Sequence, residues 1–243
     1  MRNPSKKVAV FLHGFLGGPQ QFDFLLPAAQ AAGFDRHALL LPGHGGDCRT
    51  FFSSSRSHWE AYVQAELDRL REEYESILLV GHSMGGLLSI LAALRDARGI
   101  CGIFAIALPL HLRVSRKGMH TNWKHVTGLG KRDAYTEAAR TSCSVNGITL
   151  WNAPRLVPRM IDLSALSRKA RRGLNKLTVP LAILHSQKDE WVSQRSVAAA
   201  LRSPVQADMI LLPESGHFLY SENDRATICH QFVRFASACP PHK

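Results

Sequence analysis

Short apolar runs recur along this chain at intervals filled by helix-like patterns, and this rhythm restricts the fold more than any other feature. Each run is apolar throughout rather than alternating, as expected for strands of a parallel sheet that helices cover on both faces. The predicted strands span residues 7–12, 37–41, 76–80, 101–108, 181–184 and 207–212. The predicted helices span residues 19–32, 57–74, 84–97, 193–202 and 222–237. We therefore expect an α/β fold with a mostly parallel sheet of about six strands.

Residues 110–176 interrupt this rhythm, because they are polar and basic and contain no convincing strand. We interpret them as a helical cap or lid inserted into a core made of residues 1–109 and 177–243. A chain of 243 residues suits one large domain with such an insertion. Hydrophobic residues make up 45% and charged residues 20% of the chain, which excludes disordered and fibrous classes of protein.

The chain carries a net charge of +11, which alone would indicate a nucleic-acid or anionic membrane partner. Residues 110–176 contain 14 basic and 3 acidic residues, whereas the remainder contains 16 of each, so the whole excess lies in the insert. No nucleic-acid-binding motif accompanies it, and we expect no nucleic-acid partner. Three interpretations stay open: a solvated basic face, attraction of an acidic acyl carrier or coenzyme A thioester, and docking on an anionic lipid surface. The densest basic run, residues 168–172, could equally lie on a core helix that faces away from the site.

No apolar run approaches the ~20 residues of a membrane-spanning helix, and none resembles a signal-peptide core. The cysteines are odd in number and scattered, with no CxxC pair: Cys48, Cys101, Cys143, Cys229 and Cys239. This pattern favours free thiols in a reducing cytoplasm over a disulfide framework or a zinc site. We expect no metal and no organic cofactor.

A G-x-S-x-G motif, Gly81-His82-Ser83-Met84-Gly85, stands between the third predicted strand and the helix that follows it. This strand–turn–helix context is the one that a nucleophilic serine on a sharp turn requires, and the glycines permit the tight backbone. The helix N-terminus supplies the positive end of a dipole and the Met84 N–H for a developing oxyanion. The spacing fits neither dinucleotide-binding nor P-loop patterns. We predict that Ser83 is a nucleophile.

A serine nucleophile needs a base that takes its proton and a carboxylate that orients the base. Asp189 and His217 follow the last two predicted strands, so they should reach the same carboxyl edge of the sheet as Ser83. The chain order Ser, Asp, His is also the one expected for this chemistry on a parallel sheet. Glu190 is an alternative acid and His185 an alternative base. The remaining histidines near the nucleophile or in the insert are interpreted as packing or surface residues.

The first predicted strand runs into the loop His13-Gly14-Phe15-Leu16-Gly17-Gly18, whose glycines let the backbone approach a substrate. A second oxyanion donor is expected from this first strand-to-helix loop. We predict that the donors are the backbone N–H groups of Phe15 and Met84. Apolar residues predicted to line a substrate pocket are Leu16, Trp123 and Trp151.

Together with Leu41-Pro42-Gly43-His44-Gly45 and Gly216-His217, these motifs resemble the α/β-hydrolase superfamily, and within it the small bacterial carboxylesterases and monoacylglycerol lipases. The resemblance covers residues 6–110 and 177–236 and does not extend to the insert. It implies an α/β-hydrolase fold with a helical cap over an apolar acyl pocket. It also implies a hydrolase that cleaves a small-molecule carboxylic ester through an acyl-enzyme on Ser83, with the predicted base and acid in those roles.

Other functions stay open on the same residues. An esterase or thioesterase could act on an acyl-carrier-linked or coenzyme A-linked substrate, drawn to the basic insert. Acyl transfer to an acceptor other than water would use the same three side chains. In a different class, the fold could serve as a non-catalytic ligand receptor.

Overall fold

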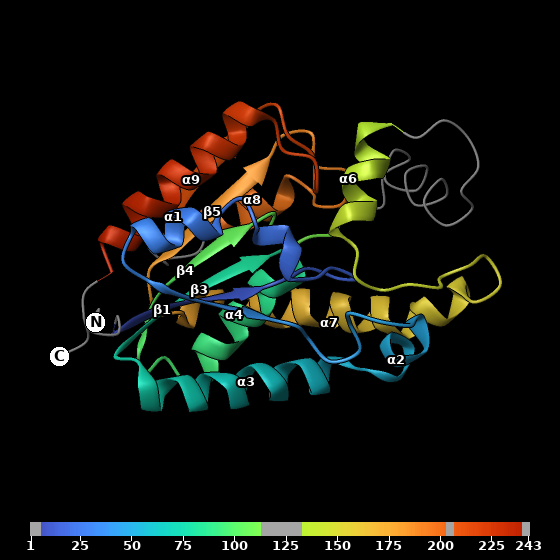
Figure 1. Cartoon of the computed structure of the whole chain (residues 1–243), viewed down its shortest axis with the longest axis horizontal. Helices are drawn as coiled ribbons and strands as arrows, with labels where there is room; N and C mark the ends of the chain where they lie inside the picture. Colours follow the sequence, from blue (N-terminus) through green and yellow to red (C-terminus); the bar gives the residue numbers. More distant parts are fainter. Residues whose placement is uncertain (1–5, 113–132, 203–206, 240–243) are drawn as a thin grey trace.

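A central six-stranded sheet organises the computed structural model, which describes residues 6–112, 133–202 and 207–239 (Figure 1). The strands are β1 (Lys7–Leu12), β2 (Asp35–Leu39), β3 (Ser76–His82), β4 (Ile100–Ile106), β5 (Leu181–Ser186) and β6 (Ala207–Leu212). All neighbours pair in parallel, in the spatial order β2-β1-β3-β4-β5-β6. The predicted parallel α/β fold is confirmed. The strand order reverses at β1, next to β3, and such a reversal creates the crevice in which open α/β sheets bind ligands.

Helices connect the strands and cover both faces of the sheet (Figure 1). The α-helices are α1 (Leu26–Ala31), α2 (Cys48–Ser53), α3 (Arg56–Glu73), α4 (Met84–Arg95), α6 (Ala134–Ser142), α7 (Val157–Gly173), α8 (Arg195–Leu201) and α9 (Glu222–Ser237). Short 3-10 helices are η1 (Pro19–Phe22), η2 (Ala153–Leu156) and η3 (Leu174–Lys176). Helices α1 and α9 pack together on one face, and α3, α4 and α7 pack together on the other. Within the described ranges, none of these helices combines the length and the apolar character that crossing a membrane requires.

Side chains of each strand alternate between two apolar clusters, one on each face of the sheet. Along β1, Val8 and Val10 join the cluster beneath α3, α4 and α7, whereas Ala9 and Phe11 join the cluster beneath α1 and α9. Trp59 of α3 is fully buried in the first cluster. Because both faces are covered, the inner strands β3, β4 and β5 are buried along their whole length, as the sequence pattern indicated. The edge strands β2 and β6 are only partly buried, and β2 begins at Asp35, before the predicted apolar run of residues 37–41, because one edge of each has no neighbouring strand.

The segment of residues 19–32, predicted as one helix, forms η1 and α1 with a break between them. Pro27 lies in the first turn of α1, where a proline is tolerated because its missing N–H would have no partner there. A continuous helix would need that N–H to donate to the carbonyl four residues earlier, so it cannot run through this position. The single-helix prediction was wrong for this reason.

Helix α7 falls within the predicted insert, yet it packs against core helix α4. Leu166 and Ala170 of α7 are fully buried in the larger apolar cluster. The basic run at residues 168–172 lies on this helix, where Lys169 pairs with Glu60 of α3. The division of the chain into a core and a cap at residues 110–176 stays a prediction, but α7, which falls within those bounds, packs as part of the core.

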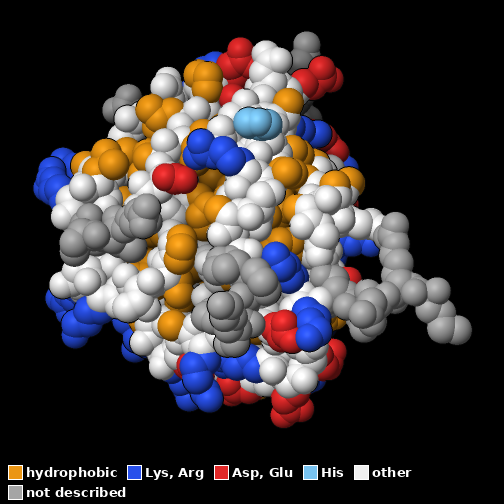
Figure 2. All heavy atoms as spheres, turned by 90° about the vertical axis from the view of Figure 1, so that its left-hand side faces the viewer, with side chains coloured by type: hydrophobic (Ala, Val, Ile, Leu, Met, Phe, Trp, Pro, Cys, Tyr) orange, Lys and Arg blue, Asp and Glu red, His pale blue; other side chains and the backbone are white. Residues whose placement is uncertain are grey.

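Outside residues 110–176, where basic and acidic residues are equal in number, the surface carries charges of both signs. Figure 2 shows the end of the molecule at which the chain begins and ends in Figure 1, with basic, acidic and apolar side chains interspersed. On α3, Arg69 pairs with both Glu66 and Glu73. Exposed pairs of this kind contribute little to stability, because water and salt screen them.

The first turn of α4 lies directly against the end of β1. A methyl group at Gly85 would lie 1.8 Å from the Leu12 carbonyl oxygen, and one at Gly81 would lie 2.4 Å from the Gly86 nitrogen. These contacts involve backbone atoms, which cannot move aside as a flexible side chain can. Glycine at positions 81 and 85 is therefore a steric requirement of the turn.

Gly85→Ala should destabilise the fold, because its methyl group cannot fit against β1. We expect a loss of about 3 kcal/mol or more in the free energy of unfolding, measured by urea titration of tryptophan fluorescence. Gly46→Ala is the matched control, since a methyl group there meets nothing within 4 Å. The control should stay within about 0.5 kcal/mol of the wild type. Equal losses in the two variants would contradict the steric argument.

Candidate active site

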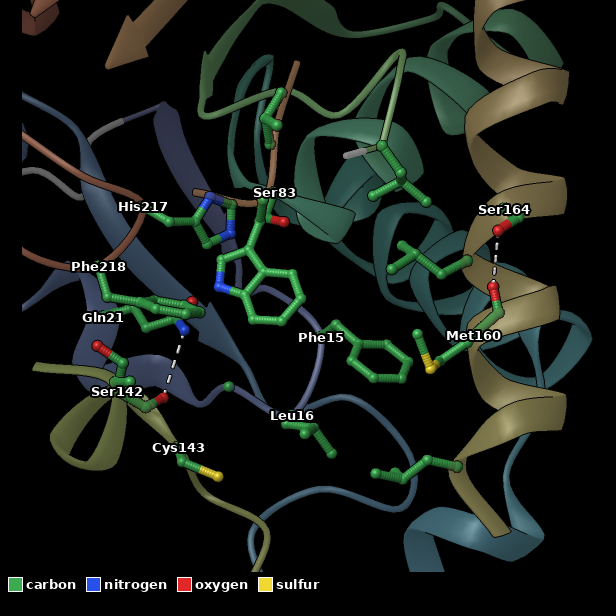
Figure 3. A pocket seen from close by; sticks show the side chains of 17 residues that line it. Phe15, Leu16, Gln21, Ser83, Ser142, Cys143, Met160, Ser164, His217 and Phe218 are labelled. Atoms are coloured by element: carbon green, nitrogen blue, oxygen red, sulfur yellow. Dashed lines mark hydrogen bonds between the residues drawn. The ribbon is translucent and has the colours of Figure 1, made fainter. Parts of the chain in front are cut away.

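Ser83 lies on a strained turn between β3 and α4, at the carboxyl edge of the sheet. Its φ of 50° is in the left-handed region, which costs about 1–3 kcal/mol for a residue with a side chain. Two backbone hydrogen bonds hold this turn. The Ser83 N–H donates to the Ile106 carbonyl at 2.9 Å, and the Ser83 carbonyl accepts from the Gly86 N–H at 3.0 Å. The turn thereby presents the serine side chain to a pocket (Figure 3).

The His217 ring lies beside Ser83 in this pocket (Figure 3). His217 Nδ1 donates to Asp189 Oδ2 at 2.9 Å, and both side chains are almost fully buried. The other oxygen, Asp189 Oδ1, accepts the backbone N–H groups of Trp191 and Val192, each at 2.8 Å. Because Nδ1 is engaged, Nε2 is the ring nitrogen left to face the serine. The structure thus brings the predicted nucleophile, base and acid together in one site.

The backbone of His217 is held from both sides. Its N–H donates to Glu190 Oε2 at 3.1 Å. Its carbonyl accepts from His82 Nε2 and from the Tyr220 hydroxyl, each at 3.1 Å. The alternative acid Glu190 therefore binds the backbone of the histidine, while Asp189 binds its ring.

Two carboxylates favour the protonated form of His217. Burial opposes a charge on the ring, but the charge and hydrogen bond of Asp189, together with the charge of Glu190, raise the pKa of His217 above its ordinary value. Burial also opposes the Asp189 carboxylate, yet His217 and the two N–H donors of the following loop lower the pKa of Asp189. The pair is thus suited to hold a proton on the ring once the ring has accepted one.

The loop of residues 13–18 is oriented by the buried side chain of His13. His13 Nε2 accepts the Leu41 N–H at 3.1 Å, so the ring proton is on Nδ1, which donates to the Gly14 carbonyl at 3.0 Å. Burial is the main reason that the pKa of His13 is lowered to about 3, so the ring stays neutral and this tautomer persists. In a trans peptide the carbonyl and the N–H point in opposite directions. The Phe15 N–H therefore points away from His13.

Both predicted oxyanion donors lie next to Ser83. Phe15 lines the pocket, and Met84 is the first residue of α4, where helix N–H groups have no partner within the helix. Within the part of the chain that the structure describes, neither N–H forms a hydrogen bond. The positive end of the α4 dipole adds to the attraction for a negative oxygen at this point.

A cavity of about 240 Å³ opens over Ser83, with mostly apolar walls. Leu156, Met160 and Leu163 form the wall on the side of α7. Leu16 also lies in the lining. Trp151 lies outside it and is 95% exposed, because the chain here turns outward before η2. Trp123 lies outside the described residues.

Sequence reasoning did not assign several side chains that the structure places at the site. The pocket tryptophan is Trp191, which follows the acid by two residues and could have been inferred from that position. Gln21 of η1 and Met160 of α7 also line the pocket, and neither carries a local sequence signal for this role. His82, interpreted as a packing residue, also holds the His217 backbone.

Other reactive groups near the site are poorly suited to replace these residues. The alternative base His185 is buried outside the pocket lining, and burial lowers its pKa. Cys143 lines the pocket, but burial raises the pKa of its thiol, which favours the less nucleophilic protonated form. Among the described residues, no three His, Cys, Asp or Glu side chains are grouped as a metal site would require.

A parallel sheet that presents a serine on a strained strand-to-helix turn, facing a histidine and a buried carboxylate, defines the α/β-hydrolase class. The family model described as "Alpha/beta hydrolase family" matches residues 9–228. The chain belongs to this family, and the predicted resemblance and fold are confirmed.

Individual relatives are distant but cover nearly the whole chain. A thermostable monoacylglycerol lipase of Bacillus sp. (strain H-257) is 23% identical over 231 residues, which are 93% of this chain and 88% of that protein. A 2-succinyl-6-hydroxy-2,4-cyclohexadiene-1-carboxylate synthase of Salmonella arizonae is 24% identical over 237 residues, 90% of each. The solved structure of Paleococcus ferrophilus monoacylglycerol lipase superposes with a TM-score of 0.74 at 17% identity, covering 98% of this chain and 96% of that one. The chain is thus a lipase- and esterase-like α/β hydrolase, and relatives at this distance carry more than one activity.

The pH dependence of ester turnover should report the carboxylates around His217. A histidine base must be neutral to accept a proton, so kcat/KM should rise with pH through a midpoint above the ordinary histidine value of 6.5. Glu190→Gln keeps an acceptor for the His217 N–H but removes one negative charge that favours the protonated ring. The midpoint should therefore move to lower pH.

The measurement is a kcat/KM profile from about pH 5 to pH 9, the range in which histidine titrates. Glu72→Gln, at an exposed position of α3, is the matched control and should leave the midpoint unchanged. A midpoint that stays put or rises in Glu190→Gln would contradict the electrostatic role of Glu190.

Proposed function

We propose that this protein is a serine hydrolase that cleaves carboxylic esters through an acyl-enzyme on Ser83. The observation that carries the proposal is the shared pocket of Ser83 and His217, with Asp189 2.9 Å from the far side of the histidine ring. Belonging to the α/β-hydrolase family supports it, as does the likeness to proteins named as lipases.

In the proposed reaction, Ser83 Oγ attacks the ester carbonyl carbon while His217 Nε2 takes the serine proton. The carbonyl oxygen becomes an oxyanion, which the N–H groups of Phe15 and Met84 stabilise. The carbon–oxygen bond to the alcohol then breaks, and His217 returns the proton to the leaving alcohol. Water repeats the sequence on the acyl-enzyme and releases the acid. Asp189 keeps the ring in the required tautomer and stabilises its charged form.

The pocket favours an ester with an apolar acyl chain. Its wall on the side of α7 is mostly leucine and methionine, which can bury hydrocarbon, and the hydroxyl of Ser164 in that wall already donates to the Met160 carbonyl. Apolar side chains also continue outward from this wall, since Val157 and Ile161 of α7 are 53% and 59% exposed. An exposed apolar rim next to an apolar pocket is consistent with a lipid-like ester.

A second candidate is a thioesterase for an acidic acyl carrier, favoured by the basic insert. Several basic side chains of the insert already have partners, however. Arg140 pairs with Glu137, and Arg171 hydrogen-bonds to His111. Arg168 and Arg172 stay exposed on α7. We therefore place this candidate second.

Ser83→Ala should abolish turnover of short p-nitrophenyl esters while leaving the fold intact. Loss of the nucleophile should lower kcat by at least about 10⁴-fold. Ser164→Ala is the matched control, because Ser164 also lines the pocket but its hydroxyl donates to Met160 within α7. The control should keep kcat within about threefold of the wild type.

Covalent labelling separates the hydrolase from a non-catalytic receptor on the same fold. A fluorophosphonate should label the wild type and the Ser164→Ala variant but not Ser83→Ala. A wild type that stays unlabelled and binds a ligand tightly without turnover would favour the receptor. Unchanged turnover in Ser83→Ala would contradict the proposed acyl-enzyme on this serine.

Salt dependence distinguishes the two substrate classes. We expect free esters with longer acyl chains to be hydrolysed faster than acetate esters, with rates insensitive to ionic strength, because apolar burial drives their binding. The measurement compares free esters with carrier-linked thioesters of the same acyl chain at about 20 mM and 500 mM NaCl, concentrations chosen to bracket effective screening. Carrier-linked substrates that are preferred at low salt and lose rate at high salt would favour the acidic carrier instead.

A further inference from the structure

Residues 142–147, which we call the cap strap, cross from the insert onto two loops of the core. The cap strap follows α6, which packs against η1. It forms an antiparallel bridge between Cys143 and Gly17 and a parallel bridge between Asn146 and Asp47. A segment of the insert is thereby joined, through its backbone, to the loop that holds the predicted oxyanion donor.

Ser144 holds this loop at two carbonyl groups. Its backbone N–H donates to the Leu16 carbonyl at 2.9 Å. Its hydroxyl donates to the Gly17 carbonyl and accepts from the Gly45 N–H, the latter at 3.1 Å. One side chain therefore connects the loop of residues 13–18 to a second core loop.

Gln21 forms a second link between the same loop and the cap strap. Gln21 Oε1 accepts the Gly14 N–H at 2.9 Å, and Gln21 Nε2 donates to the Ser142 carbonyl at 3.3 Å (Figure 3). The amide thus holds the peptide group between His13 and Gly14, one peptide before that of the Phe15 N–H, and its other end holds the cap strap.

The loop needs such support because its backbone is strained. Leu16 has a φ of 59°, a left-handed conformation that is unfavourable for a leucine. The cap strap also lies too close for a larger residue beneath it, since a methyl group at Gly18 would lie 2.8 Å from Ser144 Cβ. A strained conformation persists where its surroundings determine it, and here the surroundings are supplied by the insert.

We propose that the cap strap positions the oxyanion hole, with Ser144 and Gln21 as positioning residues. The proposal rests on the proposed role of the Phe15 N–H as an oxyanion donor. Phe15 lies between Gly14, which Gln21 holds, and Gly17, which Ser144 of the cap strap holds. The cap therefore contributes to the chemical step through the geometry of this loop, in addition to covering the pocket.

Ser144→Ala should lower kcat with little change in KM, because a displaced donor is lost mainly from the transition state. We expect a decrease of about tenfold in kcat and a change below about twofold in KM, less than the loss of a whole oxyanion donor. Inhibition by a trifluoromethyl ketone, which forms an oxyanion on the serine, should weaken by the same factor. Ser144→Thr keeps the hydroxyl and should restore most of both.

Ser53→Ala is the matched control, because the Ser53 hydroxyl donates to Arg49 within α2. It should leave kcat, KM and the inhibition constant unchanged. Gln21→Met provides a second variant outside the cap strap and should give the same kcat effect, with thermal unfolding confirming that each variant is folded.

Hydrogen exchange provides a readout that does not depend on turnover. The peptide containing residues 13–18 should exchange faster in Ser144→Ala than in the wild type and in Ser53→Ala, which tests the support of the loop even if the proposed esterase activity is absent. A folded Ser144→Ala variant with wild-type kcat and exchange would overturn the inference, as would an effect on KM alone.

Discussion

The turn at Ser83 is the constraint on which the rest of this structure depends. A serine whose backbone has a positive φ is stable only where the strand before it and the helix after it are both tightly held. Here Gly85 lets the first turn of α4 contact β1, and Gly81 of β3 lets that strand contact the same turn, at distances that no side chain would permit. The same contact places Ser83 at the reversal of strand order, between the ends of β1 and β3. The loop after β1 and the N-terminus of α4 consequently meet at the serine, and the pocket follows from that meeting.

Much of this arrangement could be predicted from sequence because it is encoded locally. A predicted apolar run overlaps every strand, although β2 begins at Asp35, two residues before its run. The carboxyl edge of a parallel sheet brings together residues that follow different strands, such as Asp189 and His217. Asp189 was predicted as the carboxylate at the histidine ring, but the contact of Glu190 with the histidine backbone could not be predicted. Both are buried carboxylates next to each other in the chain, and only the geometry of the loop sends one to the histidine ring and the other to its backbone. The links through Ser144 were also beyond prediction, since they join residues 99 or more positions apart. They also depend on a hydroxyl that belongs to no recognisable sequence motif.

The basic residues of the insert lie in different structural surroundings, although the sequence counts them as one positively charged segment. Part of it belongs to α7, which packs on α4 and contributes Leu166 to the core while its first half lines the pocket. A basic residue on such a helix can link it to a neighbouring helix, as Lys169 does by pairing with Glu60 of α3. Part of the positive charge of the insert therefore belongs to the packing of α7 against its neighbouring helix.

The histidines around the site show how one residue type takes opposite roles. His13 and His82 are buried without a carboxylate on the ring, and burial is the main reason that the pKa of each is lowered to about 3. Each therefore stays neutral and acts as a fixed hydrogen-bonding group, His13 toward the Gly14 carbonyl and His82 toward the His217 carbonyl. His217 is just as buried, but Asp189 and Glu190 reverse the effect and raise its pKa. A proton can thus be accepted at one histidine while its neighbours keep their tautomers, and the difference arises from where two carboxylates lie. Electrostatics rather than residue type therefore separates His217 from the two histidines that act as fixed hydrogen-bonding groups.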